Sequence, residues 1–207
     1  MRRSEFEVVD HEEIKALLDE ASYGVLGTQG EDGWPELTPL NFVYCDGAVY
    51  FHGSKVGQKM RNLKAEPKAT FSVSKEYAII PSHFLDPKLA CPATAYFKSV
   101  LIKGHAEIVT ELQHKADALA AFMRKLQPEG GYAPIVPSDA DYEPQLRATS
   151  VVRIRIEQMT GKFKLGQNLK EDTFAKITEG LAGRGRELDA ETIALMKAFC
   201  PHHREQA

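Results

Sequence analysis

The spacing of apolar residues near the start of the chain predicts a helix. Ile14, Leu17 and Leu18 recur at the three- and four-residue intervals that place side chains on one face of an α-helix. Asp10, followed three residues later by Glu13, is typical of a helix cap. We therefore expect a short amphipathic helix ahead of the other elements.

The pattern then changes to short apolar runs that are broken by turn-forming residues. The runs are YGVLGT, ELTPLNFVY and AVYFHG, at residues 23–28, 36–44 and 48–53. Asp46 and Gly47 separate the last two, and an Asp-Gly pair suits a hairpin whose central residues need positive φ. These runs predict three consecutive antiparallel strands.

Three longer segments also have the composition of strands. KATFSVSKEYAII at 68–80 and TAYFKSVLIKGHAEIVT at 94–110 are rich in β-branched and aromatic residues. SVVRIRIEQMTGKF at 150–163 alternates apolar and charged residues, as a strand with one solvated face does. We expect at least six antiparallel strands in a closed or nearly closed barrel, because closure removes exposed edges.

Helical patterns occur between and after these strands. A short helix is predicted at 58–63, a longer amphipathic one at 111–126, and two short helices in the tail around GLAGRGRELD, the second capped by Asp189. Residues 81–93 and 127–145 are expected to be irregular. The predicted fold class is mostly β, with helices at the periphery.

Composition and charge exclude several classes of function. The chain has 207 residues, 43% of them hydrophobic, and a formal net charge of −3. This balance provides no general basic field for a nucleic acid or an anionic bilayer. No apolar run approaches the roughly 18 to 20 residues of a membrane span, so a soluble, cytoplasmic protein is expected.

Motifs for metals, disulfides and hydrolysis are missing from the sequence. The three cysteines are far apart, and no CxxC, HxH or HExxH pattern occurs, so neither a disulfide framework nor a metal site is predicted. GxSxG, GxGxxG and GxxxxGK[ST] do not occur either.

The segment VYFHGSKVGQKMRNL, at 49–63, combines a strand end with cations. If a strand ends at Phe51 and a helix begins soon after, the peptide N–H groups of the turn between them are unpaired. Together with Ser54, Lys55 and Lys59 they would suit an anion such as a terminal phosphate. The alternative is that Lys55, Lys59 and Arg61 only form a solvated helix face.

Two neighbouring features bear on the molecule to which such an anion would belong. Pro35 and Pro39 interrupt PELTPLNFVY, so this strand is expected to be irregular or at a sheet edge, with main-chain groups free to meet a flat heterocycle. A plain edge strand is the alternative. His52 is compatible with a structural role, ring stacking, proton donation or axial metal ligation.

Five segments occur in an order and spacing that characterise a known family. They are YGVLGT, GWPELTPLNFVY, DGAVYFHGSKVGQKMRNLKAEPKATFSV, YFKSVLIKGHAEIV and TGKFKLGQN. Over residues 8–168 the chain resembles the pyridoxamine 5′-phosphate oxidase-like FMN-binding split-barrel superfamily, and most of all its nitroimidazole-resistance (Nim-type) branch. The resemblance implies a six-stranded split barrel over 1–168, a helical extension over 169–207 packed on the same domain, and a homodimer with FMN at the subunit interface.

The resemblance also implies positions for the cofactor. The residues expected to line FMN from its ring to its phosphate are Thr38, Pro39, Leu40, Asn41, Phe51, His52, Gly53, Ser54, Gln58 and Lys59. Ser99 is expected to face the flavin, from the neighbouring subunit, and Lys164 and Gln167 are expected to form a second element near it. His52 is the candidate catalytic residue.

Some positions depart from the family pattern. Gln58 stands where relatives often have an arginine before the phosphate-binding lysine, and Glu36 stands where some have another cation. We expect weaker phosphate binding or compensation by another group. The chain also ends in PHHREQA, without the arginine-rich segment of true pyridoxamine phosphate oxidases, which disfavours the vitamin B6 reaction.

The leading hypothesis from the sequence is an FMN-dependent oxidoreductase. A nicotinamide or other donor would reduce the flavin, and a small electron-poor acceptor such as a nitroaromatic would receive the electrons. One alternative is a haem- or flavin-binding sensor without rapid turnover. Another is an interaction protein with a vestigial nucleotide site that regulates a partner through the helices beyond residue 168.

Overall fold

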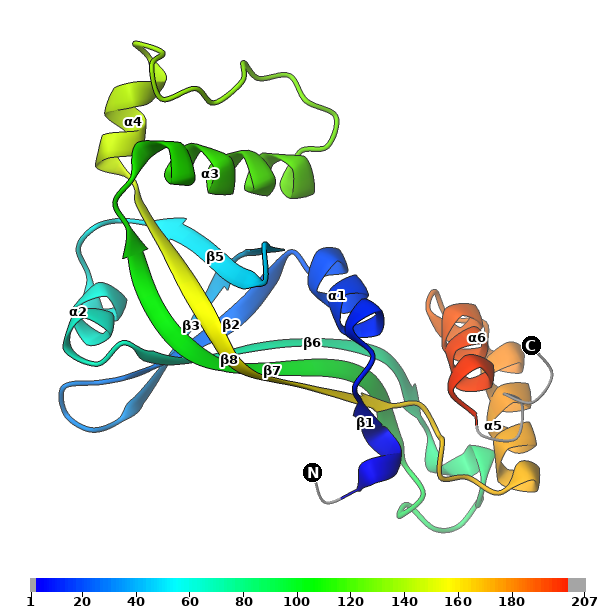
Figure 1. The fold of residues 1–207 in the computed structure, drawn as a ribbon. Coiled ribbons are helices and arrows are strands. Elements are labelled where there is room, and N and C mark those ends of the chain that lie inside the picture. Colours follow the sequence, from blue (N-terminus) through cyan, green and yellow to red (C-terminus); the bar gives the residue numbers. More distant parts are fainter. Residues whose placement is uncertain (1–2, 201–207) are drawn as a thin grey trace. The chain divides into compact units, whose positions relative to one another are not determined.

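The computed structural model describes residues 3–200, in which strands and helices alternate along the chain (Figure 1). The strands are β1 (Glu7–Val8), β2 (Tyr23–Gln29), β3 (Pro35–Asn41), β4 (Val43–Cys45), β5 (Ala48–Gly53), β6 (Lys68–Ile80), β7 (Thr94–Val109) and β8 (Ser150–Lys164). The helices are α1 (His11–Glu20), α2 (Gln58–Ala65), α3 (Leu112–Leu126), α4 (Tyr142–Ala148), α5 (Glu171–Arg184) and α6 (Asp189–Phe199), with short 3-10 helices η1 (Ser4–Phe6) and η2 (Ser82–Phe84).

The strands form one sheet in the order β3-β2-β6-β7-β8-β5-β4, and β1 pairs with β8. The pairings of β2 with β3 and β6, of β4 with β5, and of β5 with β8 are antiparallel. In the hairpin between β4 and β5, Asp46 and Gly47 both have positive φ, as predicted. The prediction of a mostly β, split-barrel type of fold with peripheral helices is confirmed.

The sheet does not close completely. Its two ends, β3 and β4, are consecutive in the chain and are separated only by Phe42, which is fully buried. The run 36–44, predicted as one strand, is therefore two. Pro35 and Pro39 lack the N–H groups that a further ladder would need, which explains why β3 stays at the edge.

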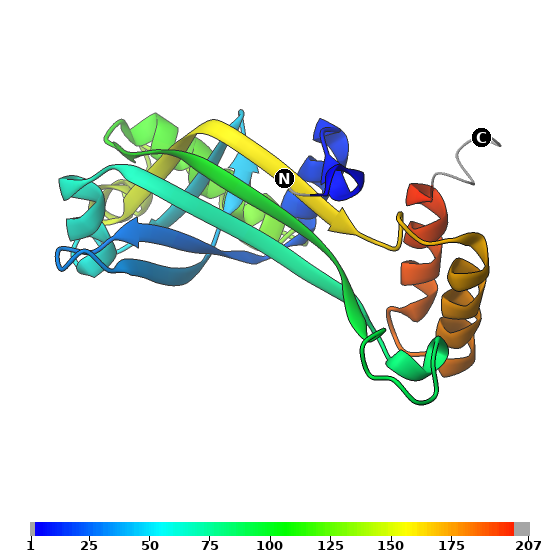
Figure 2. The ribbon, with the colours of Figure 1, turned by 90° about the horizontal axis from the view of Figure 1, so that it is seen from below.

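Contacts between Cα atoms divide the described residues into two compact units. The barrel unit comprises residues 11–73 and 100–160, and the tail unit comprises residues 3–10, 74–99 and 161–200. Strands β6, β7 and β8 run side by side and contribute to both units (Figures 1 and 2).

Aromatic and aliphatic side chains fill the centre of the barrel unit. The predicted face of α1 is buried through Ile14, Leu17 and Leu18. Phe42 packs edge-on against Phe71, with ring centroids 4.9 Å apart. The contact between Phe42 and Phe71 joins the residue after β3 to β6, which helps to hold the edge strand in place.

Two details of the helices differ from the sequence-based expectations. Helix α4 lies partly in the segment 127–145 that was expected to be irregular; its Pro144 stands in the first turn, where a proline is tolerated, but reads as a breaker in sequence. Asp189 does not cap α6 from outside, because α6 begins at this residue. Its carboxylate instead binds Arg184 and accepts the main-chain N–H of Arg186.

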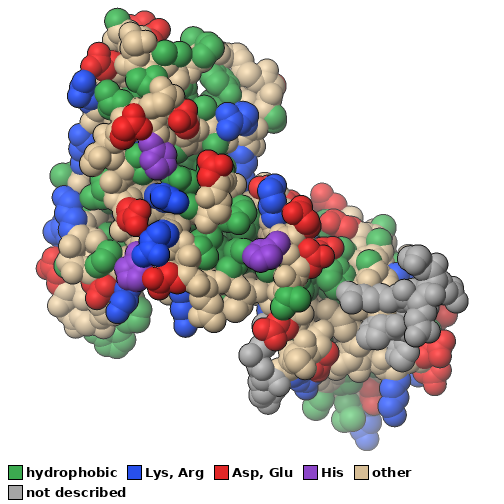
Figure 3. Space-filling model, in the orientation of Figure 1, with side chains coloured by type: hydrophobic (Ala, Val, Ile, Leu, Met, Phe, Trp, Pro, Cys, Tyr) green, Lys and Arg blue, Asp and Glu red, His purple; other side chains and the backbone are tan. Residues whose placement is uncertain are grey.

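Charges of both signs are mixed on the face shown in Figure 3. This agrees with the net charge of −3, which provides no basic field. No helix within residues 3–200 is long and apolar enough to cross a bilayer.

Candidate functional site

The predicted corner between a strand and a helix is formed by β5 and α2. Strand β5 pairs with β8 as far as Gly53, which lies opposite Ser150. Gly57 then has a φ of 115°, in the region that favours glycine, and α2 begins at the next residue. Because glycine has no side chain, no side-chain hydrogen bond caps the first turn of α2.

The ammonium group of Lys59 lies over this corner. A methyl group added at Gly53 would come within 3.3 Å of Lys59 Nζ, so the lysine folds back from the first turn of α2 onto the end of β5. The structure thus brings together a strand end, an uncapped helix start and a cation. This combination is of a kind that favours anion binding, because the amides of a helix start and an ammonium group both attract negative charge.

His52 is exposed beside this corner and rests against α3. Its ring meets Phe122 edge-on, with centroids 4.9 Å apart. Partial burial, and then the charge of Lys59, lower the pKa of His52 below its ordinary value. The imidazole is therefore neutral at pH 7, with one nitrogen that donates and one that accepts.

Ser54 and Lys55 are exposed in the turn that follows. The Ser54 hydroxyl accepts a hydrogen bond from Val56 N at 3.2 Å, which stabilises the turn. Lys55 lies close enough to Lys115 to lower the pKa of that lysine, although burial is the larger cause. Lys115 itself donates to main-chain carbonyl groups at the end of α4.

Strand β3 places the predicted ring-binding residues along the open edge of the sheet. Thr38 and Leu40 are half-buried, whereas Pro39 and Asn41 are exposed. The Asn41 amide donates to Ser22 O at 2.8 Å. One main-chain side of β3 has no strand partner among the described elements, so it meets the requirement for contact with the polar edge of a heterocycle.

The two departures from the family pattern contact each other. Gln58 Nε2 donates to Glu36 Oε1, and Asn62 Nδ2 donates to Glu36 Oε2 at 3.0 Å. Asn62 is buried and also donates to Thr28 Oγ1. Glu36 therefore fastens β3 to one face of α2, and the Gln58 amide is engaged by the carboxylate rather than directed at Lys59.

The other predicted site residues have local partners or are buried. Phe51 is fully buried in the barrel unit, so only its main chain is available to a cofactor. Ser99, Lys164 and Gln167 belong to the tail unit. Ser99 Oγ donates to Lys162 O, and Lys164 Nζ donates to Thr94 Oγ1. The Gln167 amide accepts from Leu165 N and donates to Phe163 O.

A polar cluster in the barrel unit was not foreseen. Tyr50 Oη and His114 Nε2 are 3.0 Å apart, and His114 lines a hollow of about 220 Å³ with Glu107 and Arg153. Burial raises the pKa of the Tyr50 hydroxyl. These residues lie on different elements that only the folded sheet brings together, so no sequence motif could have revealed the cluster. Within residues 3–200, no group of three or more His, Cys, Asp or Glu side chains could hold a metal ion.

Comparisons with known proteins identify a matching family and several structures of the same fold. The model of the family described as pyridoxamine 5′-phosphate oxidase matches residues 10–163. A comparison with curated proteins gave no significant match.

Three solved structures have the same fold. Flavocytochrome Anf3 from Azotobacter vinelandii is 26% identical, with a TM-score of 0.66 over 82% of this chain and 75% of that one. A candidate 5-nitroimidazole antibiotic resistance protein from Bacteroides thetaiotaomicron is 24% identical, with a TM-score of 0.60 over 75% and 85%. A FAD and heme binding protein from Mycobacterium smegmatis is 20% identical, with a TM-score of 0.65 over 87% and 81%.

Proposed function

We propose, from the premise that this chain belongs to the pyridoxamine 5′-phosphate oxidase family, that it binds FMN and works as an oxidoreductase. One observation carries the proposal: the Lys59 ammonium lies over Gly53 beside the uncapped start of α2. A terminal phosphate needs this set of main-chain donors and one cation. The open edge of β3 extends from there as a surface for a flat ring.

In this proposal each residue of the corner contacts a different part of FMN or of the acceptor. Lys59 and the first amides of α2 hold the phosphate, and Thr38 to Asn41 contact the ring and the ribityl chain. Bound FMN supplies the electron-transfer chemistry. His52, neutral at pH 7, donates a hydrogen bond that orients the acceptor or passes it a proton. Ser99, from the neighbouring subunit, and Lys164 and Gln167 are the remaining residues that we propose to contact FMN.

The proposed electron donor is a nicotinamide or another reductant, and the proposed acceptor is small, flat and electron-poor, as nitroaromatics are. The fold that the chain shares with the candidate 5-nitroimidazole resistance protein supports this acceptor class. The vitamin B6 reaction is not part of the proposal.

Pairing of two subunits through the open edge of the sheet is also proposed. Trp34 and Leu37 are 73% and 72% exposed at the β2–β3 hairpin and on β3, and Tyr23 is 62% exposed on β2. Large exposed apolar side chains at a sheet edge favour contact with another chain. A homodimer formed there would bury the edge and enclose the ring of the flavin.

Haem binding is the second candidate function. The imidazole of His52 is exposed and neutral, which is the form that ligates iron. The similarity to flavocytochrome Anf3, at 26% identity, supports this alternative. The absorption spectrum of the purified protein separates the two candidates, because flavin and haem have different visible bands.

Replacement of Lys59 by alanine tests the proposed role of the corner. Loss of one charged hydrogen bond should cost about 2 kcal/mol, or about 30-fold in the Kd for FMN. Titration of the apo-protein with FMN, followed by NADH or NADPH oxidation with a nitroimidazole, measures both affinity and turnover. Lys64→Ala is the matched control, because Lys64 is exposed at the other end of α2. Unchanged affinity in Lys59→Ala would refute the phosphate role.

A further inference from the structure

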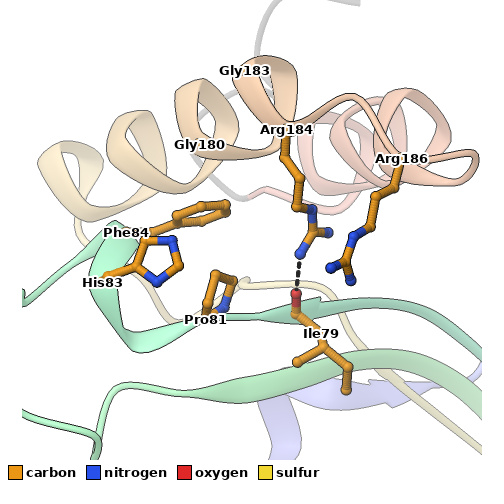
Figure 4. A pocket seen from close by; sticks show the side chains of 8 residues that line it. All are labelled: Ile79, Pro81, His83, Phe84, Gly180, Gly183, Arg184 and Arg186. Atoms are coloured by element: carbon orange, nitrogen blue, oxygen red, sulfur yellow. Dashed lines mark hydrogen bonds between the residues drawn. The ribbon is translucent and has the colours of Figure 1, made fainter.

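A pocket of about 440 Å³ lies within the tail unit, between α5 and the segment that follows β6 (Figure 4). Its walls include Ile79, Pro81, His83 and Phe84 on one side and α5 on the other. The volume is in the range of sites for small organic molecules. None of the residues predicted to bind FMN lines it.

Two glycines of α5 make room for this pocket. A methyl group added at Gly180 would come within 2.6 Å of the Phe84 ring, so the bare helix surface allows the ring to lie against it. A methyl group added at Gly183, one turn further, would meet no atom within 4 Å. The helix surface therefore contacts the Phe84 ring at Gly180 and borders open space at Gly183.

The side chain of Arg184 is held by hydrogen bonds to other residues of the chain. Its Nε and Nη2 donate to the Asp189 carboxylate at 2.9 and 2.5 Å, and its Nη1 donates to Ile79 O at 2.7 Å (Figure 4). The two charges neutralise each other, and the bond to Ile79 fixes the end of β6 against the turn after α5. Arg184 thus forms a rigid side of the pocket. The pair of Arg184 and Asp189 carries no net charge.

Arg186 differs because, within residues 3–200, its exposed guanidinium has no hydrogen-bond partner, although its charge adds to the hydrogen bond from Arg184 in lowering the pKa of Asp189. Its N–H donates to Asp189 Oδ2 at 2.8 Å, which fixes the position of the residue. Its guanidinium extends into the same space as that of Arg184 (Figure 4), and in the described part of the chain no carboxylate forms an ion pair with it. The pocket therefore has apolar and aromatic walls, and the two arginines and the one carboxylate described here leave one positive charge in excess.

We propose that this pocket binds a flat aromatic molecule that carries a carboxylate, with the carboxylate on Arg186 and the ring system against Ile79, Pro81 and the rings of His83 and Phe84. Guanidinium matches a carboxylate with two parallel hydrogen bonds. Ile79 is 45% exposed, and a ring in the pocket would cover it. The pocket shares no residue with the proposed flavin site, so the two proposals can be tested independently.

The experiment is calorimetric titration of the full chain with 2-naphthoate, compared with the uncharged 2-naphthamide and with inorganic phosphate alone. We expect saturable binding of naphthoate, with binding of the amide and of phosphate at least 10-fold weaker. Arg186→Ala should weaken naphthoate binding by about 10- to 100-fold, the effect of losing hydrogen bonds to a charged group. Arg186→Lys should recover part of this loss, because it keeps the charge but not the paired geometry.

A second pair of variants tests the volume rather than the charge. Gly183→Phe should fill the open space and abolish naphthoate binding, whereas Gly183→Ala should leave it within about 3-fold of the parent. Arg147→Ala, an exposed arginine of the barrel unit, controls for general charge effects. Circular dichroism and thermal melting establish that each variant is folded. The proposal is overturned if the parent protein shows no saturable naphthoate binding below 1 mM. It is also overturned if folded Arg186→Ala and folded Gly183→Phe both bind naphthoate as tightly as the parent protein does.

Discussion

Gly24 shows how one missing side chain decides a contact between strands. The aromatic ring of Phe71, on the neighbouring strand β6, lies where a side chain on Gly24 would be: an added methyl group would come within 2.5 Å of it. The ring is fully buried, so a shift of it would disturb close-packed neighbours.

Gly24→Ala should therefore destabilise the protein through overpacking, by about 1 to 3 kcal/mol. Gly27→Ala, in the same strand, is the matched control, because its nearest contact would be an ordinary 3.5 Å. Urea unfolding of both variants measures the difference. Equal stability of the two would show that the Phe71 ring can move aside.

Lys125 supplies a residue-scale prediction about pH. Its Nζ donates to Leu18 O and Phe42 O and lies 3.8 Å from the centre of the Phe42 ring. Burial lowers the pKa of Lys125 to about 8 in the folded protein. In the unfolded chain the group keeps its ordinary, higher pKa, so between these two values the unfolded state binds more protons.

The contribution of Lys125 to stability should consequently rise with pH above about 8, as the penalty for burying its charge disappears. We expect the parent protein to gain stability relative to Lys125→Met when urea unfolding is repeated at pH about 9.5 instead of about 7. The methionine keeps most of the apolar packing but cannot titrate. A parent and a variant with the same pH dependence would contradict the lowered pKa.

Among the elements, α2 depends on a carboxylate from β3. Glu36 accepts hydrogen bonds from two residues one turn apart on α2, Gln58 and the buried Asn62. The helix is short and would be marginal alone, so this attachment sets its position. The same carboxylate lies near the proposed phosphate corner, which connects the stability of α2 with its affinity for an anion.

Glu36→Ala should destabilise the fold by about 1 to 3 kcal/mol, because it leaves the buried Asn62 amide without this acceptor. Glu31→Ala is the control: its carboxylate is 3.8 Å from Arg61 on the same helix, but both side chains are exposed, and such pairs contribute little. Thermal unfolding compares the two variants. If both lose equally little stability, Glu36 does not hold α2.

At the scale of the whole molecule, the open edge of the sheet at β3 is the proposed contact between two subunits. If the proposed homodimer forms through β3, Leu37→Glu should weaken it, because the new charge would be buried in the interface. We expect sedimentation velocity to show a dimer for the parent and mainly monomer for this variant. Val9→Glu, at a residue 83% exposed in the tail unit, should remain dimeric. A monomeric parent protein would exclude the assembly.

The amino-acid sequence alone determined the longer strands, most helices and the corner between β5 and α2, but not β1 or the division between β3 and β4. These features follow from local rules, namely apolar periodicity, the Asp46-Gly47 turn and the proline content of β3, which act over a few residues. Helix α4 was not predicted because Pro144 resembles a helix breaker in the sequence. Proline lacks a main-chain N–H, but in the first turn of α4 that N–H would have no partner within the helix.

Only the tertiary structure decided which side chains meet. Glu36 engages Gln58, Tyr50 meets His114, and Arg184 joins Asp189 to β6, leaving Arg186 directed into a pocket. Such contacts join residues from separate elements, and they depend on strand register and helix packing. Local sequence patterns do not contain that information, because a shift of one residue along a strand turns a side chain to the opposite face.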